Sequence, residues 1–312
     1  MTIIFFGILL SLFLFNNNIF ASQLIPQFGV TDEEIRMLVL RLRNEDINKA
    51  KHNQIIVNYQ GHTTARDTKD NAKAPLFTKV DSSLIRKPTF EKFIALMDNY
   101  HFEVGKIEQN DNEERREIVD FIDAIFETRP WKILIEFLQK KKHPYAKDVP
   151  NFKRWIKQLW FDDYSRAKGV PDTSGFEHVF IGESKNGEIA GMHSWLRFYT
   201  LERNRTANFD YQGFIIKRFD ILAMIRYIWE GAMKKTGGFF IGTSPEFEMA
   251  LYTFCFLSRR GFKTCDFELD GCPFSVTSYD MTQFNKVHVG TVYPAPGPLN
   301  DQCRNANNRK QG

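Results

Sequence analysis

The stretch Gly175–Trp195, "GFEHVFIGESKNGEIAGMHSW", marks the point at which the 312-residue chain changes from a helical to a strand-like pattern. Before it, apolar residues recur at helical spacing, as in Ile118, Phe121, Ile122 and Ile125. After it, short runs rich in β-branched and aromatic residues alternate with turn residues. Helices followed by strands predict an α+β fold, in which an N-terminal helical lobe packs on a C-terminal lobe of mainly antiparallel β-sheets.

Five segments of the N-terminal half carry apolar residues at the spacing of an amphipathic helix. The first begins at Thr31, which can form a capping box with Glu34. Residues 51–80 are polar and contain Gly61 and Pro75, which predicts a long loop with little structure of its own. The expected helices cover residues 31–50, 89–99, 113–128, 131–141 and 151–161.

Short apolar runs separated by turn residues predict strands in the C-terminal half. One helix interrupts them, because Ser244 can cap a helix that has Pro245 in its first turn and an apolar face with Phe247 and Leu251. The expected strands cover residues 179–181, 195–200, 214–217, 222–229, 239–241, 263–269, 274–279 and 287–293.

Residues 1–21 are expected to be a secretory signal peptide, since an apolar run over residues 2–15 is followed by the small residues Ala21 and Ser22. A membrane anchor is the alternative, but the run breaks at Asn16, short of the roughly 20 residues that span a bilayer. We therefore expect a secreted chain that has no stable membrane insertion once the signal is removed.

The remaining chain is expected to form one domain over residues 24–297. Its helical lobe would cover about residues 24–165 and its β-rich lobe about residues 166–297. The last segment, residues 298–312, is polar and is expected to be a disordered tail.

Net charge and cysteine content exclude few of the possible functions of this protein. The net charge of +4 permits an anionic partner such as RNA without identifying one, because nucleic-acid binders usually concentrate positive charge on one face. Cys255, Cys265, Cys272 and Cys303 form no CxxC motif and allow either one or two disulfides or buried free thiols. Asn204 begins the only N-glycosylation sequon, "NRT".

Two histidines in the opening stretch, His178 and His193, are the strongest candidates for chemistry. The Asn186-Gly187 pair between them predicts a tight turn that would fold the segment back and bring the imidazoles together. A metal site with Glu177, His178, Glu183 and His193 is the alternative. Neighbours on a strand point to opposite faces, and neither HExxH nor a third nearby histidine is present, so this alternative is disfavoured.

An acid/base pair of histidines suits the cleavage of RNA near neutral pH. RNA supplies its own nucleophile, the 2′-hydroxyl, so its cleavage needs only a base, an acid and a cation for the charge that builds on phosphorus. A lysine can serve as that cation. A serine hydrolase is disfavoured because the chain has no GxSxG elbow.

Three motifs occur in order along the chain: "SGFEHVFIGE", "GMHSWLRFY" and "FIGTSPEFEMALYTFCF". Together they resemble the EndoU family of poly(U)-specific endoribonucleases of the placental protein 11 type, and the resemblance runs from about Thr31 to Tyr293. It implies an enzyme that cuts single-stranded RNA at uridines by attack of the 2′-hydroxyl and leaves a 2′,3′-cyclic phosphate. The expected partner is single-stranded, uridine-containing RNA, and the expected state is a monomer.

The resemblance also implies a catalytic group of two histidines and a lysine. These fall on His178 in "FEHVF", His193 in "GMHSW" and Lys234 in "WEGAMKKTGG", with Lys235 as the alternative lysine. By the same resemblance His193 is the general base and His178 the acid, although which histidine has which role stays open. Met192 and Ser194 depart from the aromatic residue and the asparagine of the family motif, and they flank the catalytic groups.

Further family positions imply substrate-binding and supporting residues. A Thr-Tyr pair falls on Ser278 and Tyr279, where the hydroxyl could read uracil and the ring could stack on ribose or base. Glu177 and Glu183 match carboxylates that orient a histidine or help bind a divalent ion. The expected cation is Mn²⁺, with Ca²⁺ as the alternative, as an aid to RNA binding or loop ordering and not as a Lewis acid.

Two other functions remain open at this point. The same scaffold could be a non-catalytic secreted module that binds RNA or anionic lipid, which would bind without forming products. A secreted protease is a third reading, disfavoured by the absence of any triad motif in the sequence.

Overall fold

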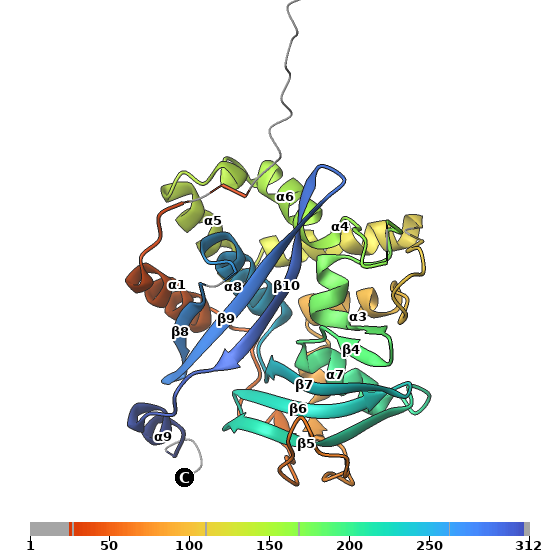
Figure 1. Cartoon of the computed structure of the whole chain (residues 1–312). Helices are drawn as coiled ribbons and strands as arrows, with labels where there is room; N and C mark the ends of the chain where they lie inside the picture. Colours follow the sequence, from red (N-terminus) through yellow and green to blue (C-terminus); the bar gives the residue numbers. More distant parts are fainter. Residues whose placement is uncertain (1–24, 27, 110, 168, 262, 309–312) are drawn as a thin grey trace, which may run out of the picture.

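The computed structural model describes residues 25–26, 28–109, 111–167, 169–261 and 263–308 (Figure 1). The expected signal peptide, residues 1–21, lies outside these residues. Across the part of the chain that the structure describes, none of the helices has both the length and the apolar character needed to cross a bilayer.

Helices make up most of the N-terminal lobe, and those of residues 112–161 lie at the upper end of the molecule in Figure 1. The capping box is confirmed, because the Thr31 side chain accepts from the Glu34 amide while the Glu34 side chain accepts from the Thr31 amide. The first helix ends at Asn44, earlier than expected. The lobe contains α1 (Asp32–Asn44), α2 (Ser82–Ile85), α3 (Pro88–Ala95), η1 (Leu96–Asp98), α4 (Asn112–Phe126), α5 (Arg129–Lys140), η2 (Pro144–Ala146) and α6 (Val149–Phe161).

The expected helix after Ser244 is confirmed as α8 (Pro245–Ser258). The Ser244 hydroxyl accepts from the Phe247 amide at 3.2 Å, so the cap lies where the sequence places it. Almost every side chain of α8 is buried, because the helix packs against α1, α3 and α5 on one side and against β9 and β10 on the other. It therefore lies at the centre of the core that joins the two lobes (Figure 1).

Two sheets form the C-terminal lobe, and the α+β class is confirmed. In the five-stranded sheet the order is β3-β4-β7-β6-β5, and only the short β4–β7 pairing is parallel. In the three-stranded sheet the order is β10-β9-β8, all antiparallel. The strands are β3 (Glu183–Lys185), β4 (Glu188–Ala190), β5 (Phe209–Arg218), β6 (Leu222–Trp229), β7 (Ala232–Phe240), β8 (Cys265–Leu269), β9 (Cys272–Gln283) and β10 (Lys286–Pro296).

Two of the expected strands are wrong. Residues 179–181 belong to η3 (Glu177–Ile181), a single turn of π-helix, and residues 195–200 lie in α7 (Trp195–Arg203). Ser194 caps α7 through its hydroxyl, which accepts from the Arg197 amide at 3.3 Å. A run of aromatic and β-branched residues favours a strand only weakly, and here the cap and the helical burial pattern outweigh that preference.

The long polar segment, residues 51–80, also differs from the expectation of an unstructured loop. It contains a small two-stranded sheet of β1 (Ile55–Val57) and β2 (Phe77–Val80). The carboxylate of Glu202 accepts from the amides of Leu76 at 2.6 Å and Phe77 at 3.0 Å, which ties the start of β2 to α7.

All four cysteines form disulfides, so the alternative of free thiols is excluded. Cys255 at the end of α8 bonds to Cys265 of β8, and Cys272 of β9 bonds to Cys303. Cys303 lies in α9 (Asp301–Asn308), inside the segment that the sequence predicts to be disordered. The expectation of a disordered tail is therefore wrong for these residues, because a covalent link holds a helix against the end of β9.

Candidate active site

Two backbone hydrogen bonds hold His178 and His193 next to each other. The Met192 amide donates to the His178 carbonyl at 3.0 Å, and the His193 amide donates to the Val179 carbonyl at 2.6 Å. A methyl group built on Gly191 would lie 1.6 Å from the His178 carbonyl oxygen, so only glycine permits this approach. The chain comes back from His178 to His193 because β3 and β4 form an antiparallel hairpin whose turn is the Asn186-Gly187 pair.

That turn confirms the prediction made from the dipeptide. Asn186 and Gly187 have φ values of 54° and 75°, the left-handed pair that a type I′ turn requires. The premise used against a metal site is wrong, however, since Glu177 and His178 lie on η3 and not on a strand.

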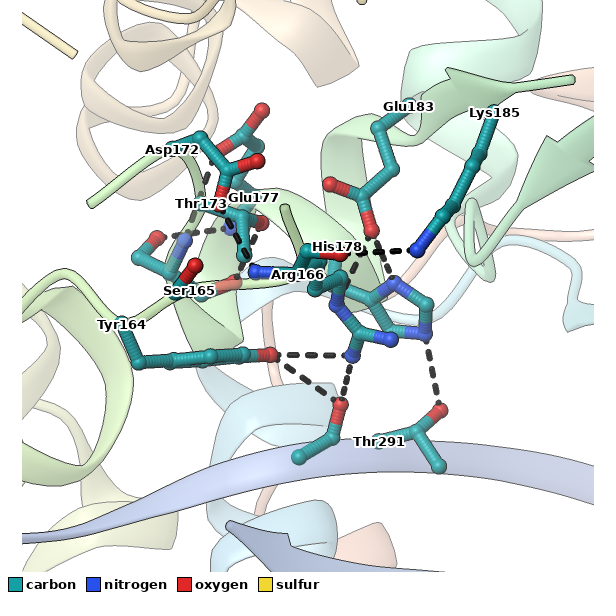
Figure 2. Close-up of polar contacts among 12 residues, drawn as sticks. Tyr164, Ser165, Arg166, Asp172, Thr173, Glu177, His178, Glu183, Lys185 and Thr291 are labelled. Atoms are coloured by element: carbon teal, nitrogen blue, oxygen red, sulfur yellow. Dashed lines mark hydrogen bonds and ion pairs between the residues drawn. The ribbon is translucent and has the colours of Figure 1, made fainter. Parts of the chain in front are cut away.

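The side chain of His178 is held at both ring nitrogens (Figure 2). Nδ1 contacts Oε1 of Glu183 at 2.7 Å, and Nε2 contacts Oγ1 of Thr291 at 3.2 Å. The expectation that a nearby glutamate orients a histidine therefore fits Glu183. Glu177 is buried as well, but its Oε2 accepts from the Ser174 amide at 3.2 Å, and burial followed by the charge of Glu108 raises the pKa of its carboxyl group.

Arg166 is a cation of the site that the sequence pattern did not indicate. Its Nε lies 3.1 Å from Oε1 of Glu183, and its Nη2 donates to the Tyr164 hydroxyl at 3.0 Å and to the Gly290 carbonyl. Figure 2 shows the guanidinium between Glu183 and Tyr164. Arg166 thus links Glu183 on one side of His178 to the residue that precedes Thr291 on the other. Its loop follows α6 and carries no motif that could have identified it.

Burial and charge shift the pKa values of His178 and Glu183 in opposite directions. Burial lowers the pKa of His178 to about 4, although the hydrogen bond with Glu183 acts to raise it. Burial acts to raise the pKa of Glu183, yet the hydrogen bond with His178 and the charge of Arg166 hold it below its usual range. In the substrate-free protein the pair is therefore a carboxylate and a neutral imidazole.

His193 has a different environment, which defines its tautomer. Nδ1 lies 2.8 Å from the carbonyl oxygen of Gly238, and a carbonyl can only accept, so Nδ1 carries the proton. Nε2 is then left with its lone pair. Burial, followed by the charge of Lys234, places the pKa of His193 well below its usual range, so the ring is neutral. The ring of Tyr293 lies 5.7 Å from it, centre to centre.

The structure brings Lys234, and not Lys235, to the histidines. Nζ of Lys234 donates to the Gly191 carbonyl at 2.6 Å, and the residue is 8% exposed. Burial lowers its pKa to about 8, against the raising effect of Glu183. Lys235 extends to the opposite side of β7, where its exposed ammonium pairs with Glu188.

The predicted substrate-binding pair, Ser278 and Tyr279, is split by the pleat of β9. Ser278 is fully buried, and its hydroxyl donates to the Arg259 carbonyl at 2.7 Å, which does not fit a role in contacting substrate. Tyr279 is 42% exposed and pairs across the sheet with Thr291, the residue that contacts His178.

Thr291 and Tyr293 were missed, although both lie at the histidines. They belong to "GTVYP", residues 290–294 of β10, and a Thr and a Tyr two positions apart on a strand share one face of the sheet. This spacing is the sequence signal that could have identified them.

The two departures from the family motif have structural roles. Met192 is fully buried with a φ of 56°, and its Cβ lies 2.7 Å from the position that a Cβ on Gly182 would take. Ser194 is 1% exposed and caps α7. Both side chains are buried, so we infer that these substitutions act on packing around the site.

The described residues contain no group of three or more His, Cys, Asp or Glu side chains arranged to hold a metal ion. The carboxylate of Glu183 is already shared by His178 and Arg166. No ligand set for Mn²⁺ or Ca²⁺ is therefore assigned.

Comparison with known proteins relates this geometry to a family. Residues 34–294 match the family model described as Endoribonuclease XendoU. Uridylate-specific endoribonuclease of Bos taurus is 36% identical over 275 residues, which are 85% of this chain and 66% of that protein. The chain thus matches 66% of the length of this relative.

Two further relatives are matched over nearly their whole length. Poly(U)-specific endoribonuclease-B of Xenopus laevis is 36% identical over 287 residues, which are 86% of this chain and 95% of that protein. The solved structure of XendoU, described as a splicing independent snoRNA processing endoribonuclease, superposes with a TM-score of 0.71 at 33% identity and covers 87% of this chain and all of that one. The chain therefore belongs to the XendoU family of endoribonucleases.

Proposed function

We propose that the protein is a secreted endoribonuclease that cleaves single-stranded RNA at uridines by attack of the 2′-hydroxyl, leaving a 2′,3′-cyclic phosphate. The observation that carries the proposal is the contrast between two neighbouring histidines. His193 donates from Nδ1 to a neutral carbonyl, whereas His178 contacts a carboxylate through Nδ1. Active sites assign one titratable group as base and another as acid by giving them environments that shift their pKa values differently.

His193 is the general base in this proposal. With its proton held on Nδ1 by Gly238, it has a free lone pair on Nε2 for the proton of the 2′-hydroxyl. Its lowered pKa keeps it unprotonated near neutral pH.

His178 is the general acid that protonates the departing 5′-oxygen. Its pKa of about 4, in which burial outweighs the raising effect of Glu183, leaves it neutral in the free protein. A bound phosphodiester anion would raise that pKa and favour the protonated ring in the complex. After the proton has passed from Nε2 to the 5′-oxygen, the ring would be neutral again and would keep its Nδ1 contact with Glu183.

Lys234 supplies positive charge for the phosphorane. Its ammonium is buried, so its attraction to the charge that builds on phosphorus is screened less than it would be in water. A divalent cation, Mn²⁺ or alternatively Ca²⁺, is proposed only as an aid to RNA binding, and no step of the reaction is routed through it.

The reaction is tested with pure protein and an oligonucleotide that contains a single uridine. We expect a product that ends in a 2′,3′-cyclic phosphate, and we expect His178→Ala, His193→Ala and Lys234→Ala to lower the rate by at least about 10²-fold. Lys235→Ala is the matched control, because its exposed ammonium lies away from the site. Assays with EDTA or with added Mn²⁺ separate any effect of a metal.

Two results would contradict the proposal. Binding of the oligonucleotide without products would favour a non-catalytic RNA-binding module. Normal rates for His178→Ala, with the protein folded by circular dichroism, would exclude the acid/base pair.

Secretion is supported by the signal-like residues 1–21 and by the two disulfides, which persist in oxidising compartments. It is tested by expressing the full chain in a eukaryotic cell and assaying the medium. Asn204 of the sequon is exposed, so glycosidase treatment of the secreted protein should reduce its mass and Asn204→Gln should abolish that shift. Retention of the whole chain inside the cell would overturn this part.

A further inference from the structure

The stem of Lys234 passes directly over Gly237. A Cβ atom built on Gly237 would lie 3.2 Å from Cγ and 3.2 Å from Cε of Lys234, closer than side chains normally pack. The ammonium beyond that stem reaches the Gly191 carbonyl at 2.6 Å. The space that a side chain at position 237 would take is therefore occupied by the lysine.

The backbone of Gly237 gives no other reason for glycine. Its φ lies outside the left-handed region, so any residue could adopt this conformation. The next neighbour of the added Cβ would be a ring carbon of Tyr227 at 3.4 Å, which is an ordinary contact. The closest atoms to an added Cβ are therefore those of the Lys234 stem.

A β-bulge places the two residues on one face. Lys234 pairs with Tyr227 and Gly237 pairs with Ile225. Between these two pairs β7 therefore has one more residue than β6. Residues three apart on a regular strand point to opposite faces, and the extra residue of a bulge cancels that inversion. The bulge thus places the position that a Cβ of residue 237 would take next to the Lys234 stem.

The next residue connects this strand segment to the second histidine. The Gly238 carbonyl accepts from Nδ1 of His193, and a Cβ on Gly238 would lie 3.2 Å from the Pro294 carbonyl oxygen of β10. The Gly237-Gly238 step therefore lies between the proposed cation and the proposed base. It is also where β7 approaches the strand that carries Thr291 and Tyr293.

We propose that Gly237 is a positioning residue for Lys234: by having no side chain, it leaves open the path along which the lysine delivers its ammonium to the histidines. This inference rests on the proposed role of Lys234 in RNA cleavage. A side chain at position 237 would displace the stem and move the ammonium away from the Gly191 carbonyl. A Cβ at 3.2 Å requires the stem to give by a few tenths of an ångström, and active sites are sensitive to such shifts, since a displacement of about 1 Å can lower the rate by about 10²-fold.

Gly237→Ala is the direct test, measured on a uridine-containing oligonucleotide. We expect kcat to fall by about tenfold or more while KM stays within about twofold, because the lost interaction is one made in the transition state. Gly29→Ala is the matched control, since nothing lies within 4 Å of the added Cβ and its backbone is not left-handed. It should cleave as the unmodified protein does.

A second measurement follows the lysine itself. Amine labelling with mass spectrometry should modify Lys234 faster in Gly237→Ala than in the unmodified protein, while labelling of the exposed Lys235 should not change. In a double-mutant cycle, Gly237→Ala should have no further effect once Lys234 is alanine, because the two act as one unit.

The outcomes separate this inference from the proposed function. Unchanged kcat and unchanged labelling of Lys234 in Gly237→Ala would overturn the positioning role. A fall in kcat with unchanged labelling would overturn it too, since Gly237 would then act through another group. Normal cleavage by Lys234→Ala would instead remove the proposed role of the lysine in the reaction.

Discussion

Glu183, the first residue of β3, lies 2.7 Å from Nδ1 of His178, which belongs to the preceding turn of π-helix. The carboxylate is fully buried, so its effect on the ring is transmitted through a medium that screens charge weakly. This contact gives the proposed acid an anionic partner that the proposed base does not have.

Replacement of Glu183 by glutamine should shift the pH dependence of cleavage. Burial lowers the pKa of His178 and the bond to Glu183 acts against burial, so removing the negative charge lowers that pKa further. An acid must be protonated, and the alkaline limb of the kcat profile, which reports the enzyme–RNA complex, should therefore move to lower pH. The measurement is a full pH–rate profile of Glu183→Gln.

Glu188→Gln is the control for this profile, because Glu188 is exposed and pairs with Lys235. Its profile should match that of the unmodified protein. An alkaline limb that stays in place in Glu183→Gln would show that this carboxylate does not control the proton of His178.

Arg166→Met should destabilise the fold. The change leaves Glu183 buried with a charge that has lost its cation, and breaking a buried ion pair from one side costs about 3 kcal/mol or more. Urea unfolding measures the difference. The comparison variant is Arg36→Met, whose exposed pair with Glu33 should contribute no more than about 1 kcal/mol. Equal midpoints for the two variants would contradict the role assigned to Arg166.

Removal of the Thr291 hydroxyl should slow cleavage, whereas removal of the Ser278 hydroxyl should not, because only Thr291 contacts a histidine of the site. Thr291→Val keeps the shape but loses the contact with Nε2 of His178, and cleavage should slow by roughly tenfold. Ser278→Ala loses only a bond to the Arg259 carbonyl, so cleavage should stay within about twofold. Initial rates on the same oligonucleotide decide the matter, and a larger loss in Ser278→Ala would restore that residue as a substrate contact.

The two disulfides should differ in their contribution to stability. Cys272 and Cys303 close a loop with a sequence separation of 31, for which chain entropy predicts about 3.7 kcal/mol, whereas Cys255 and Cys265 are separated by 10, for which it predicts about 2.7 kcal/mol. The free energy of unfolding of each double alanine variant tests this order. The reverse order would mean that native packing, and not loop closure, sets the difference.

Much of the fold follows from local patterns in the sequence. The capping box at Thr31, the cap at Ser244 and the Asn186-Gly187 turn all form as expected, because each depends on groups within a few residues of one another. The strand expected over residues 222–229 is confirmed with the same bounds in β6. The change from helices to strands near Gly175 was enough to indicate the α+β class.

Local preference failed where distant contacts or covalent links decide the structure. Residues 195–200 have strand-like composition but form α7, whose aromatic face packs on β5–β7. Residues 301–308 are polar, yet the bond between Cys272 and Cys303 holds them against β9 as α9. Apart from the Ser194 cap of α7, the contacts that decide these two helices join residues outside a short window of sequence.

The sequence by itself determined which residues belong to the candidate site: His178, His193, a lysine of the Lys234-Lys235 pair, and Glu183. Only the tertiary structure decided which lysine reaches the histidines, because a bulge in β7 sets the face to which each side chain points. It also brought Arg166 to Glu183 and Thr291 to His178. The contact of His178 with Thr291 joins residues 113 positions apart, and that of Lys234 with Gly191 joins residues 43 apart. Their geometry depends on how the two sheets pack and not on any local pattern.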